Sequence, residues 1–369
     1  MAKINILMVL DNTGRGGAQS YAMNVLRNID QERFNIDFVV NRNPKNGYGD
    51  EIIKLGSRIH YIPKFKVYNW SAYSKAWHTI LRKYKYNIIH GHVSSTAGIY
   101  LKLAKKYGCT TIAHSHSAGY RGNWFEKKIK QIFTKSAKIY ADYWFACSDI
   151  AAKRLFGENH KNNPNYYEIP NAIISSKYKF DEKIRNKLRT QLGINEETLL
   201  VGHVGSFSEP KNHAFLLEIF KNIKKRTACA KLLLVGEGPL KQDIDNNAHK
   251  LNIFDDIIFT GNVANVNEYM MAMDVMIFPS LFEGFPVTVI EAQASGLYTV
   301  LSNTITQQVY LTKHLVPMSL EDDPSVWAQV ALDYKSDDRI TANDIINASC
   351  FNMDNSIKNL EELYKKMHR

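Results

Sequence analysis

The stretch that decides the fold reads Ser280-Leu281-Phe282-Glu283-Gly284-Phe285-Pro286-Val287-Thr288-Val289-Ile290-Glu291-Ala292. An apolar strand ends before it at Pro279, and its Gly/Pro turn leads into a helix that begins near Val287. Free backbone N–H groups and the positive end of this helix can bind a phosphate. Glu283 lies in the turn and Glu291 about one turn into the helix, so two carboxylates flank that position. They can accept hydrogen bonds from the hydroxyls of a sugar or a ribose.

The same alternation of apolar strand and helix recurs along the whole chain. Strands are predicted at 4–10, 36–40, 59–62, 88–92, 110–114, 144–146, 199–204, 231–235, 257–260, 275–278 and 298–301. Helices are predicted at 19–28, 71–84, 98–107, 213–225, 240–251, 266–272, 287–294 and 325–334. This order indicates parallel sheets covered on both faces. We therefore expect an α/β fold of two Rossmann-like, doubly wound domains facing across a cleft, with ligands beyond the carboxyl ends of the strands.

The boundary between the two domains is expected near Pro170, because proline fixes one backbone dihedral angle and Asn171 tolerates a turn. Residues 1–170 would form the N-terminal domain and residues 171–354 the C-terminal domain. The last stretch, 355–369, carries apolar residues at helical spacing and is predicted to be an amphipathic helix.

Composition narrows the class of protein. The chain has 369 residues, of which 45% are hydrophobic, so it can bury a large core and is not expected to be disordered. Its four cysteines are far apart and form neither a disulfide framework nor a metal knuckle, which fits a reducing cytoplasm. The sequence contains no run of 18 apolar residues and no signal-peptide pattern at its start, so we expect a protein that is soluble or at most bound to a membrane surface.

The excess of positive over negative charge lies entirely in the first half of the chain. The formal net charge is +11, but residues 1–171 carry +15 and residues 172–369 carry −4. A basic amphipathic helix is predicted around Lys127, Lys128, Lys130 and Lys135, facing an anionic acceptor or an anionic membrane surface. The alternative is an ordinary core-facing helix with a solvated lysine side. No nucleic-acid-binding module accompanies the charge, so no nucleic acid partner is expected.

The segment around Glu283 and Glu291 resembles the E-x7-E signature of the retaining glycosyltransferases of family 4. The resemblance extends to four further segments, at 14–19, 204–213, 234–240 and 259–263, and in effect spans the chain. It implies the GT-B architecture, in which the final helix returns to the first domain.

The resemblance also implies roles for individual residues. Glu283 would hold hydroxyls of the donor sugar, Glu291 the ribose hydroxyls, and Lys211 would neutralise the departing diphosphate, with Lys211, Glu283 and His116 forming the catalytic group. The implied donor-binding residues are Gly16, Gly17, Ser206, Lys211, Gly236, Glu237, Val263, Glu283, Gly284, Phe285, Pro286, Val287 and Glu291. The family's arginine in the Lys211 motif is missing, since Gly205 and Ser206 stand there, and Arg15 is a possible substitute.

Two His-x-His pairs end predicted strands, His90 with His92 and His114 with His116. A metal site of four imidazoles is conceivable, but no suitably spaced carboxylate completes it, so no metal is expected. In the family, a histidine of this region points at the sugars. We assign that role to His116, with His114 as the second choice.

The function these observations favour is retaining transfer of a sugar from a nucleotide diphosphate sugar, expected to be a UDP-sugar. The acceptor would be a hydroxyl of a saccharide, expected to be linked to polyprenyl diphosphate. No cofactor is expected besides this co-substrate. The resemblance places the protein in bacterial capsule, exopolysaccharide or O-antigen assembly, peripheral at the inner face of the cell membrane. The alternatives are a catalytically silent partner protein and a nucleotide-sugar epimerase.

Overall fold

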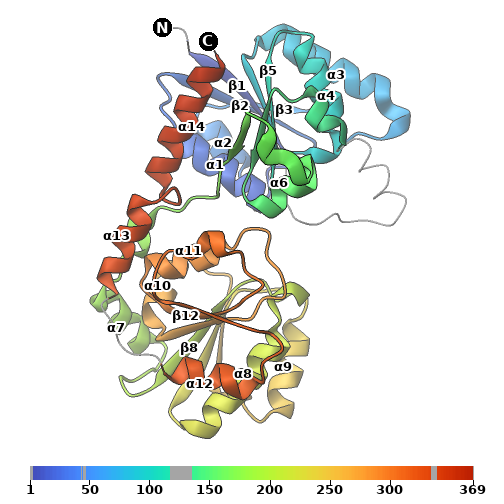
Figure 1. The fold of residues 1–369 in the computed structure, drawn as a ribbon. Helices are drawn as coiled ribbons and strands as arrows, with labels where there is room; N and C mark the ends of the chain where they lie inside the picture. The colour runs from blue at the N-terminus through green and yellow to red at the C-terminus, as the bar shows by residue number, and fades with distance from the viewer. Residues whose placement is uncertain (1–2, 43, 45–46, 117–134, 334–338, 369) are drawn as a thin grey trace. The chain divides into compact units, whose positions relative to one another are not determined.

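The computed structural model describes residues 3–42, 44, 47–116, 135–333 and 339–368. The chain divides into two compact units. Unit 1 comprises Met1–Ala172 together with Met353–Arg369, and unit 2 comprises Ile173–Asn352. The division falls two residues after the expected boundary, and the final helix belongs to unit 1 (Figure 1).

Unit 1 is built on a seven-stranded sheet in the order β3-β2-β1-β4-β5-β6-β7, and each neighbouring pair is parallel. Its strands are β1 (Ile4–Val9), β2 (Phe34–Val40), β3 (Ile59–Tyr61), β4 (Ile88–Gly91), β5 (Thr110–Ser115), β6 (Tyr143–Ala146) and β7 (Tyr166–Glu168). Its helices are α1 (Gly17–Asn28), α2 (Gly49–Lys54), α3 (Trp70–Tyr84), α4 (Ala97–Lys105), α6 (Asp149–Phe156) and α14 (Met353–Met367), with the 3₁₀ helices η1 (Val67–Asn69), η2 (Ser94–Thr96) and η3 (Glu158–Asn162).

Unit 2 contains a six-stranded parallel sheet in the order β10-β9-β8-β11-β12-β13. Its strands are β8 (Leu199–Val204), β9 (Ala230–Val235), β10 (Ile257–Gly261), β11 (Val275–Phe278), β12 (Tyr298–Ser302) and β13 (Leu315–Met318). Its helices are α7 (Glu182–Gln191), α8 (His213–Arg226), α9 (Lys241–Lys250), α10 (Val266–Ala272), α11 (Val287–Ala294), α12 (Pro324–Leu332) and α13 (Ile340–Ala348), with the 3₁₀ helices η4 (Ser175–Tyr178), η5 (Glu209–Lys211), η6 (Phe254–Asp256) and η7 (Gln307–Val309).

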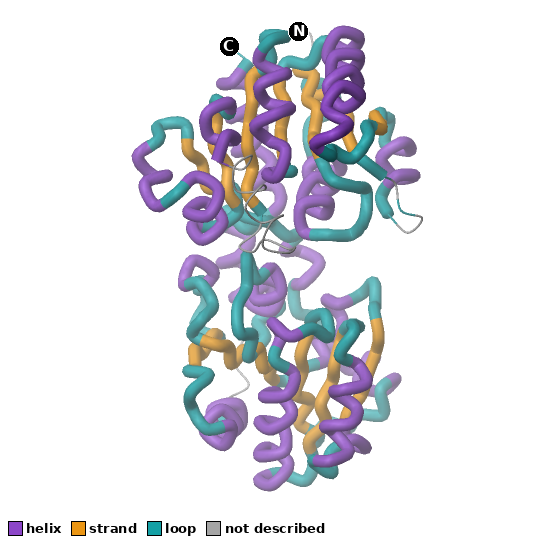
Figure 2. Tube along the Cα trace, turned by 90° about the vertical axis from the view of Figure 1, so that its right-hand side faces the viewer, coloured by secondary structure: helices purple, strands orange, loops and turns teal. Residues whose placement is uncertain are grey.

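In each unit the strands run between layers of helices (Figure 2). All four residues of the central strand β11 are buried, since a strand covered on both faces places successive side chains into two cores. The expected pair of Rossmann-like, doubly wound domains is confirmed.

Helix α14 packs on unit 1 through one apolar face, on which Ile357, Leu360 and Tyr364 are buried. The Glu361 carboxylate also accepts a hydrogen bond of 2.9 Å from the backbone N–H of Asp30. Among the described residues, no helix is long and apolar enough to cross a bilayer.

The sequence-based assignment missed several elements, notably the edge strands β7 and β13 and the helices α7 and α13. An edge strand has one open side, and β13 contains Pro317 and an incompletely buried face, so its apolar pattern is weak. The predicted basic helix lies mostly outside the described residues, Lys127, Lys128 and Lys130 included. Lys135 is described and is exposed at the start of a helical stretch.

Candidate functional site

The carboxyl ends of two neighbouring strands in unit 2 bring Lys211 and Glu283 together. Lys211 ends η5, which follows β8, and Glu283 lies in the loop after β11. The two loops are joined by a hydrogen bond of 2.8 Å from the N–H of Leu281 to the carbonyl of Pro210. The Lys211 Nζ lies 2.7 Å from Oε1 of Glu283, and both side chains are about 15% exposed (14% and 15%). The cation and the carboxylate expected to hold a donor are therefore paired with each other.

Gly205 makes room for this arrangement. A Cβ at Gly205 would lie 3.0 Å from Cε of Lys211 and 3.2 Å from Nε2 of His203, so a side chain there would press on the lysine. The neighbouring Ser206 is exposed, and its Oγ lies 3.0 Å from Oγ of Ser208. This turn therefore carries two hydroxyls, those of Ser206 and Ser208.

The loop after β9 packs backbone to backbone against the loop after β8. Gly236 has a φ of 140°, and a Cβ there would come within 2.1 Å of the carbonyl oxygen of Gly205. The backbone N–H of Phe207 donates to the carbonyl of Glu237 at 2.9 Å, which links the two loops. Glycine is required at position 236, because an L side chain tolerates neither this φ nor this approach. The Glu237 side chain accepts a hydrogen bond of 3.1 Å from Asn262.

Ser206, Lys211, Gly236, Glu237, Val263 and Glu283 thus lie on loops that follow β8, β9, β10 and β11, which are neighbours in the sheet. The remaining residues of unit 2 that were predicted to bind the donor lie at the start of α11 or within it. Pro286 precedes the first helical residue, Val287, and no side chain of the described residues caps the helix. Its first N–H groups and its positive end lie beside the Glu283 loop, where they can accept an anion.

Glu291 lies just over one turn into α11, and its Oε1 accepts a hydrogen bond of 2.7 Å from the Tyr178 hydroxyl. Burial raises the pKa of the Glu291 carboxyl above its ordinary value, and the Tyr178 hydrogen bond acts in the opposite direction. Tyr178 ends η4, 113 positions away in sequence, and no sequence signal identified it.

In unit 1, Gly16 and Gly17 begin α1 directly after the loop that follows β1. A Cβ at Gly17 would meet no atom within 4 Å, so packing does not require a glycine there. The guanidinium carbon of Arg15 lies 5.5 Å from the centre of the Tyr48 ring, also in unit 1.

The four histidines gather into one cluster, because β4 and β5 are paired in parallel register. Nε2 of His90 lies 3.0 Å from Nδ1 of His114, and Nδ1 of His92 lies 2.8 Å from Nε2 of His116. Tyr364 of α14 contacts Nδ1 of His90 at 2.6 Å. Tyr364 was not among the predicted residues, because it is 274 positions away in sequence.

Burial lowers the pKa of all four imidazoles, to about 3 for His90 and for His116, so the rings are neutral at pH 7. Among the described residues, the buried Nδ1 of His116 has no hydrogen-bond partner. Ring nitrogens of His90, His92 and His114 lie within 4.8 Å of one another, a set that could also hold a metal ion.

Two family models match this chain. Residues 15–176 match the model "Glycosyltransferase Family 4", and residues 184–332 match "Glycosyl transferases group 1". EpsF of Bacillus subtilis, named as a glycosyltransferase, is 32% identical over 329 residues, which cover 88% of this chain and 86% of EpsF.

Two further proteins that resemble this chain are named with a substrate or a bound nucleotide. The UDP-Gal:alpha-D-GlcNAc-diphosphoundecaprenol alpha-1,3-galactosyltransferase of Escherichia coli is 25% identical over 61% of this chain and 59% of its own length. The crystal structure of Anabaena Alr3699/HepE in complex with UDP has a TM-score of 0.77 at 15% identity, covering 99% of this chain and all of that one, which shows a shared fold. From the family models and the similarity to EpsF, the chain belongs to glycosyltransferase family 4.

Proposed function

We propose that this protein transfers a sugar from a UDP-sugar to a hydroxyl of a saccharide acceptor carried on polyprenyl diphosphate, with retention of anomeric configuration. The reaction would serve bacterial surface polysaccharide synthesis at the inner, cytoplasmic face of the cell membrane. The observation that carries the proposal is the Lys211–Glu283 pair beside the uncapped start of α11. The UDP bound in the Anabaena structure and the lipid-linked substrate named for the Escherichia coli relative support the donor and acceptor classes.

Donor binding would break this ion pair and give each of the two side chains its own contact with the donor. Lys211 would turn to the diphosphate, where it stabilises the negative charge that develops as the sugar leaves. Glu283 would accept hydrogen bonds from sugar hydroxyls. The backbone N–H groups of Phe285 and of Val287, which otherwise donates to the carbonyl of Phe285 at 3.0 Å, would donate to the phosphate. Because Lys211 and Glu283 pair with each other, neither charge is left uncompensated before the donor binds.

Glu291 would hold the ribose. Its carboxylate accepts one hydrogen bond from Tyr178, which leaves acceptor positions for the two ribose hydroxyls. In unit 1, Gly16 and Gly17 would allow close approach of a ligand to the backbone, and the His116 ring would orient the sugar or the acceptor hydroxyl.

In the transfer step, the bond from the anomeric carbon to the diphosphate oxygen breaks, and its electron pair stays on the diphosphate. The acceptor oxygen forms its bond to the same face of the sugar, and its proton passes to the departing diphosphate oxygen. The products are UDP and the extended saccharide. Lys211 and the helix end supply the charge neutralisation, so we propose that the step needs no metal ion.

Product analysis tests this function. The purified protein is incubated with a panel of UDP-sugars and a saccharide diphosphate lipid, with and without EDTA, and the products are examined by mass spectrometry and NMR. We expect release of UDP and a product linkage with the same anomeric configuration as the donor. The Lys211→Ala and Glu283→Ala variants should bind UDP weakly and turn over poorly. Lys187→Ala, an exposed lysine on α7, is the matched control. An inverted linkage, or full activity of the Glu283→Ala variant, contradicts the proposal.

A further inference from the structure

The excess positive charge of the first half arises from one long stretch. Between Ile52 and Ala141 the sequence holds 17 lysines and arginines and a single acidic residue, Glu126. Within the described part of this stretch, the helix α3 and the residues just before and after it carry Lys64, Lys66, Lys75, Arg82, Lys83 and Lys85, all of them exposed.

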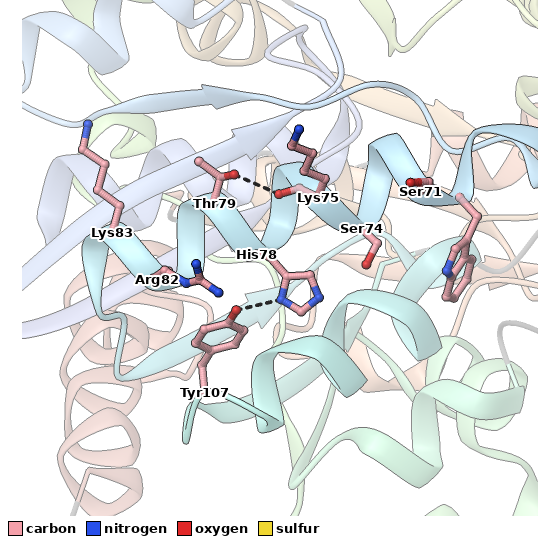
Figure 3. Close-up of a pocket in the computed structure, with 9 residues that line it drawn as sticks. Ser71, Ser74, Lys75, His78, Thr79, Arg82, Lys83 and Tyr107 are labelled. Atoms are coloured by element: carbon pink, nitrogen blue, oxygen red, sulfur yellow. Dashed lines mark hydrogen bonds between the residues drawn. The ribbon is translucent and has the colours of Figure 1, made fainter.

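Helix α3 has two different faces. Tyr73, Trp77, Ile80 and Leu81 are buried in the core of unit 1. The opposite side borders a surface pocket of about 890 Å³, lined by Trp70, Ser71, Ser74, Lys75, His78, Thr79, Arg82, Lys83 and Tyr107 (Figure 3). In Figure 3, His78 and Arg82 turn toward Tyr107, while the exposed side chains of Lys75 and Lys83 extend away from Tyr107. The His78 ring is held by a hydrogen bond of 2.7 Å between Nδ1 and the Tyr107 hydroxyl.

Within the described part of the chain, no acidic side chain pairs with the cations of this face. Among the residues that the structure describes, no carboxylate oxygen lies within 4.0 Å of the charged groups of Lys75, Arg82 or Lys83. By contrast, Lys105 on the neighbouring helix α4 is paired with Asp142 at 2.7 Å. A cluster of unpaired like charges is suited to an external anionic surface.

Two exposed aromatic side chains stand at the amino end of the same helix. Tyr68 is 82% exposed and Trp70 is 50% exposed. The Trp70 ring packs edge-on against Phe65 at 6.0 Å between centroids, which holds it in place without burying it. Tryptophan and tyrosine favour the boundary between lipid headgroups and acyl chains, and lysine and arginine favour anionic headgroups.

We propose that the α3 face of unit 1, defined by Tyr68, Trp70, Lys75, Arg82 and Lys83, docks on an anionic phospholipid bilayer. Tyr68 and Trp70 enter the headgroup boundary, the three cations contact lipid phosphates, and the pocket between α3 and Tyr107 receives a headgroup. The inference rests on the proposed membrane partner, and it assigns the contact to described residues other than Lys127, Lys128 and Lys130.

Vesicle co-sedimentation tests the proposal on the full chain. Vesicles of phosphatidylcholine alone are compared with vesicles of equal parts phosphatidylcholine and phosphatidylglycerol, at low and high salt. We expect binding to the anionic vesicles, weakened by salt, and a decrease of about 100-fold in the partition coefficient of the Lys75→Glu/Arg82→Glu/Lys83→Glu variant. The matched control reverses three exposed lysines of unit 2, Lys187→Glu/Lys225→Glu/Lys250→Glu, and should bind nearly as the wild type.

Two further measurements locate the contact. Brominated lipids should quench tryptophan fluorescence of the wild type, and Trp70→Phe should remove a large part of that quenching. The Lys127→Glu/Lys128→Glu/Lys130→Glu variant should lose less binding than the α3 variant. Equal binding to neutral vesicles, an α3 variant that binds as the wild type, or loss confined to the second triple variant each overturns the proposal.

Transfer to a water-soluble acceptor analogue separates this proposal from the proposed function. The α3 variant should keep that activity, because its substitutions lie outside the residues assigned to the donor. Activity without α3-dependent vesicle binding refutes the docking surface alone, whereas docking without any transfer refutes the enzyme function alone.

Discussion

The ion-paired cations of unit 2 and the cations of the α3 face of unit 1 have different surroundings. In unit 2, Asp274 pairs with Arg185 and Arg189, Asp256 pairs with Lys224 and Lys231, and Lys211 pairs with Glu283. On the α3 face of unit 1, the described cations have no such partners. The difference teaches that a lysine count does not measure a binding surface, since paired cations stabilise the fold while unpaired ones remain available to an external anion.

The largest effect should come from exchanging the two charges of the central pair. In the Lys211→Glu/Glu283→Lys variant the ion pair can reform, so the thermal unfolding midpoint should stay close to that of the wild type. Turnover should fall about 1,000-fold, because the cation no longer stands at the diphosphate. Steady-state kinetics measure the turnover, and calorimetry measures the unfolding midpoint. Retained turnover would show that the pair serves the fold alone.

Replacing a paired cation should cost more folding stability than replacing an unpaired one. Arg189 is 4% exposed and donates to the carbonyls of Asn195 and Thr198, both at 2.7 Å, and to Asp274 at 3.1 Å. Arg189→Met should lower the free energy of unfolding by about 3 kcal/mol, because it leaves buried acceptors unpaired. Lys83→Met on α3 should change it by less than about 0.5 kcal/mol. Urea unfolding measures both, and similar losses would contradict the contrast between the units.

The histidine cluster of unit 1 should make stability depend on pH. Burial lowers the pKa of His90 and His116 to about 3, whereas the same rings titrate near 6.5 when unfolded. Between these values the unfolded chain binds more protons than the folded one, so stability falls as the pH is lowered from about 6.5 toward about 3. Urea midpoints across this range should show the slope, and it should flatten in His90→Gln. His249→Gln, on the exposed part of α9, is the control.

Tyr178→Phe should have a moderate effect confined to donor binding. Burial raises the pKa of Glu291, and Tyr178 lowers it through its hydrogen bond, so removing the hydroxyl moves the pKa further up. Ionised Glu291 is the form that accepts ribose hydroxyls. The rise in donor KM on the acid side should therefore begin at a higher pH in the variant, with kcat little changed. A KM profile that does not shift would remove Glu291 from the ribose site.

The smallest effect should come from Gly17→Ala. A Cβ there meets no atom within 4 Å, and alanine favours a helix more than glycine does. The variant should be as stable as the wild type or more stable by up to about 1 kcal/mol, yet its donor KM should rise. An unchanged KM would mean that Gly17 only shapes the turn before α1 and does not contact the donor.

Sequence patterns predicted the central strands well, because a strand buried on both faces reads as a run of apolar residues. They also placed the loops of Lys211, Gly236 and Glu283, whose motifs have a local spacing. They missed β13, an incompletely buried edge strand, and Tyr178, a single tyrosine in a short 3₁₀ helix. Neither feature produces a periodic signal.

By itself, the sequence determined the alternation of strands and helices, the two-domain α/β class and the concentration of positive charge in the first half. Those are properties of neighbouring residues and of composition. Only the tertiary structure decided that Lys211 meets Glu283 across 72 positions, that Tyr178 meets Glu291 across 113, and that Tyr364 meets His90 across 274. Such contacts depend on the order and register of parallel strands, which hydrophobic periodicity along the chain does not encode.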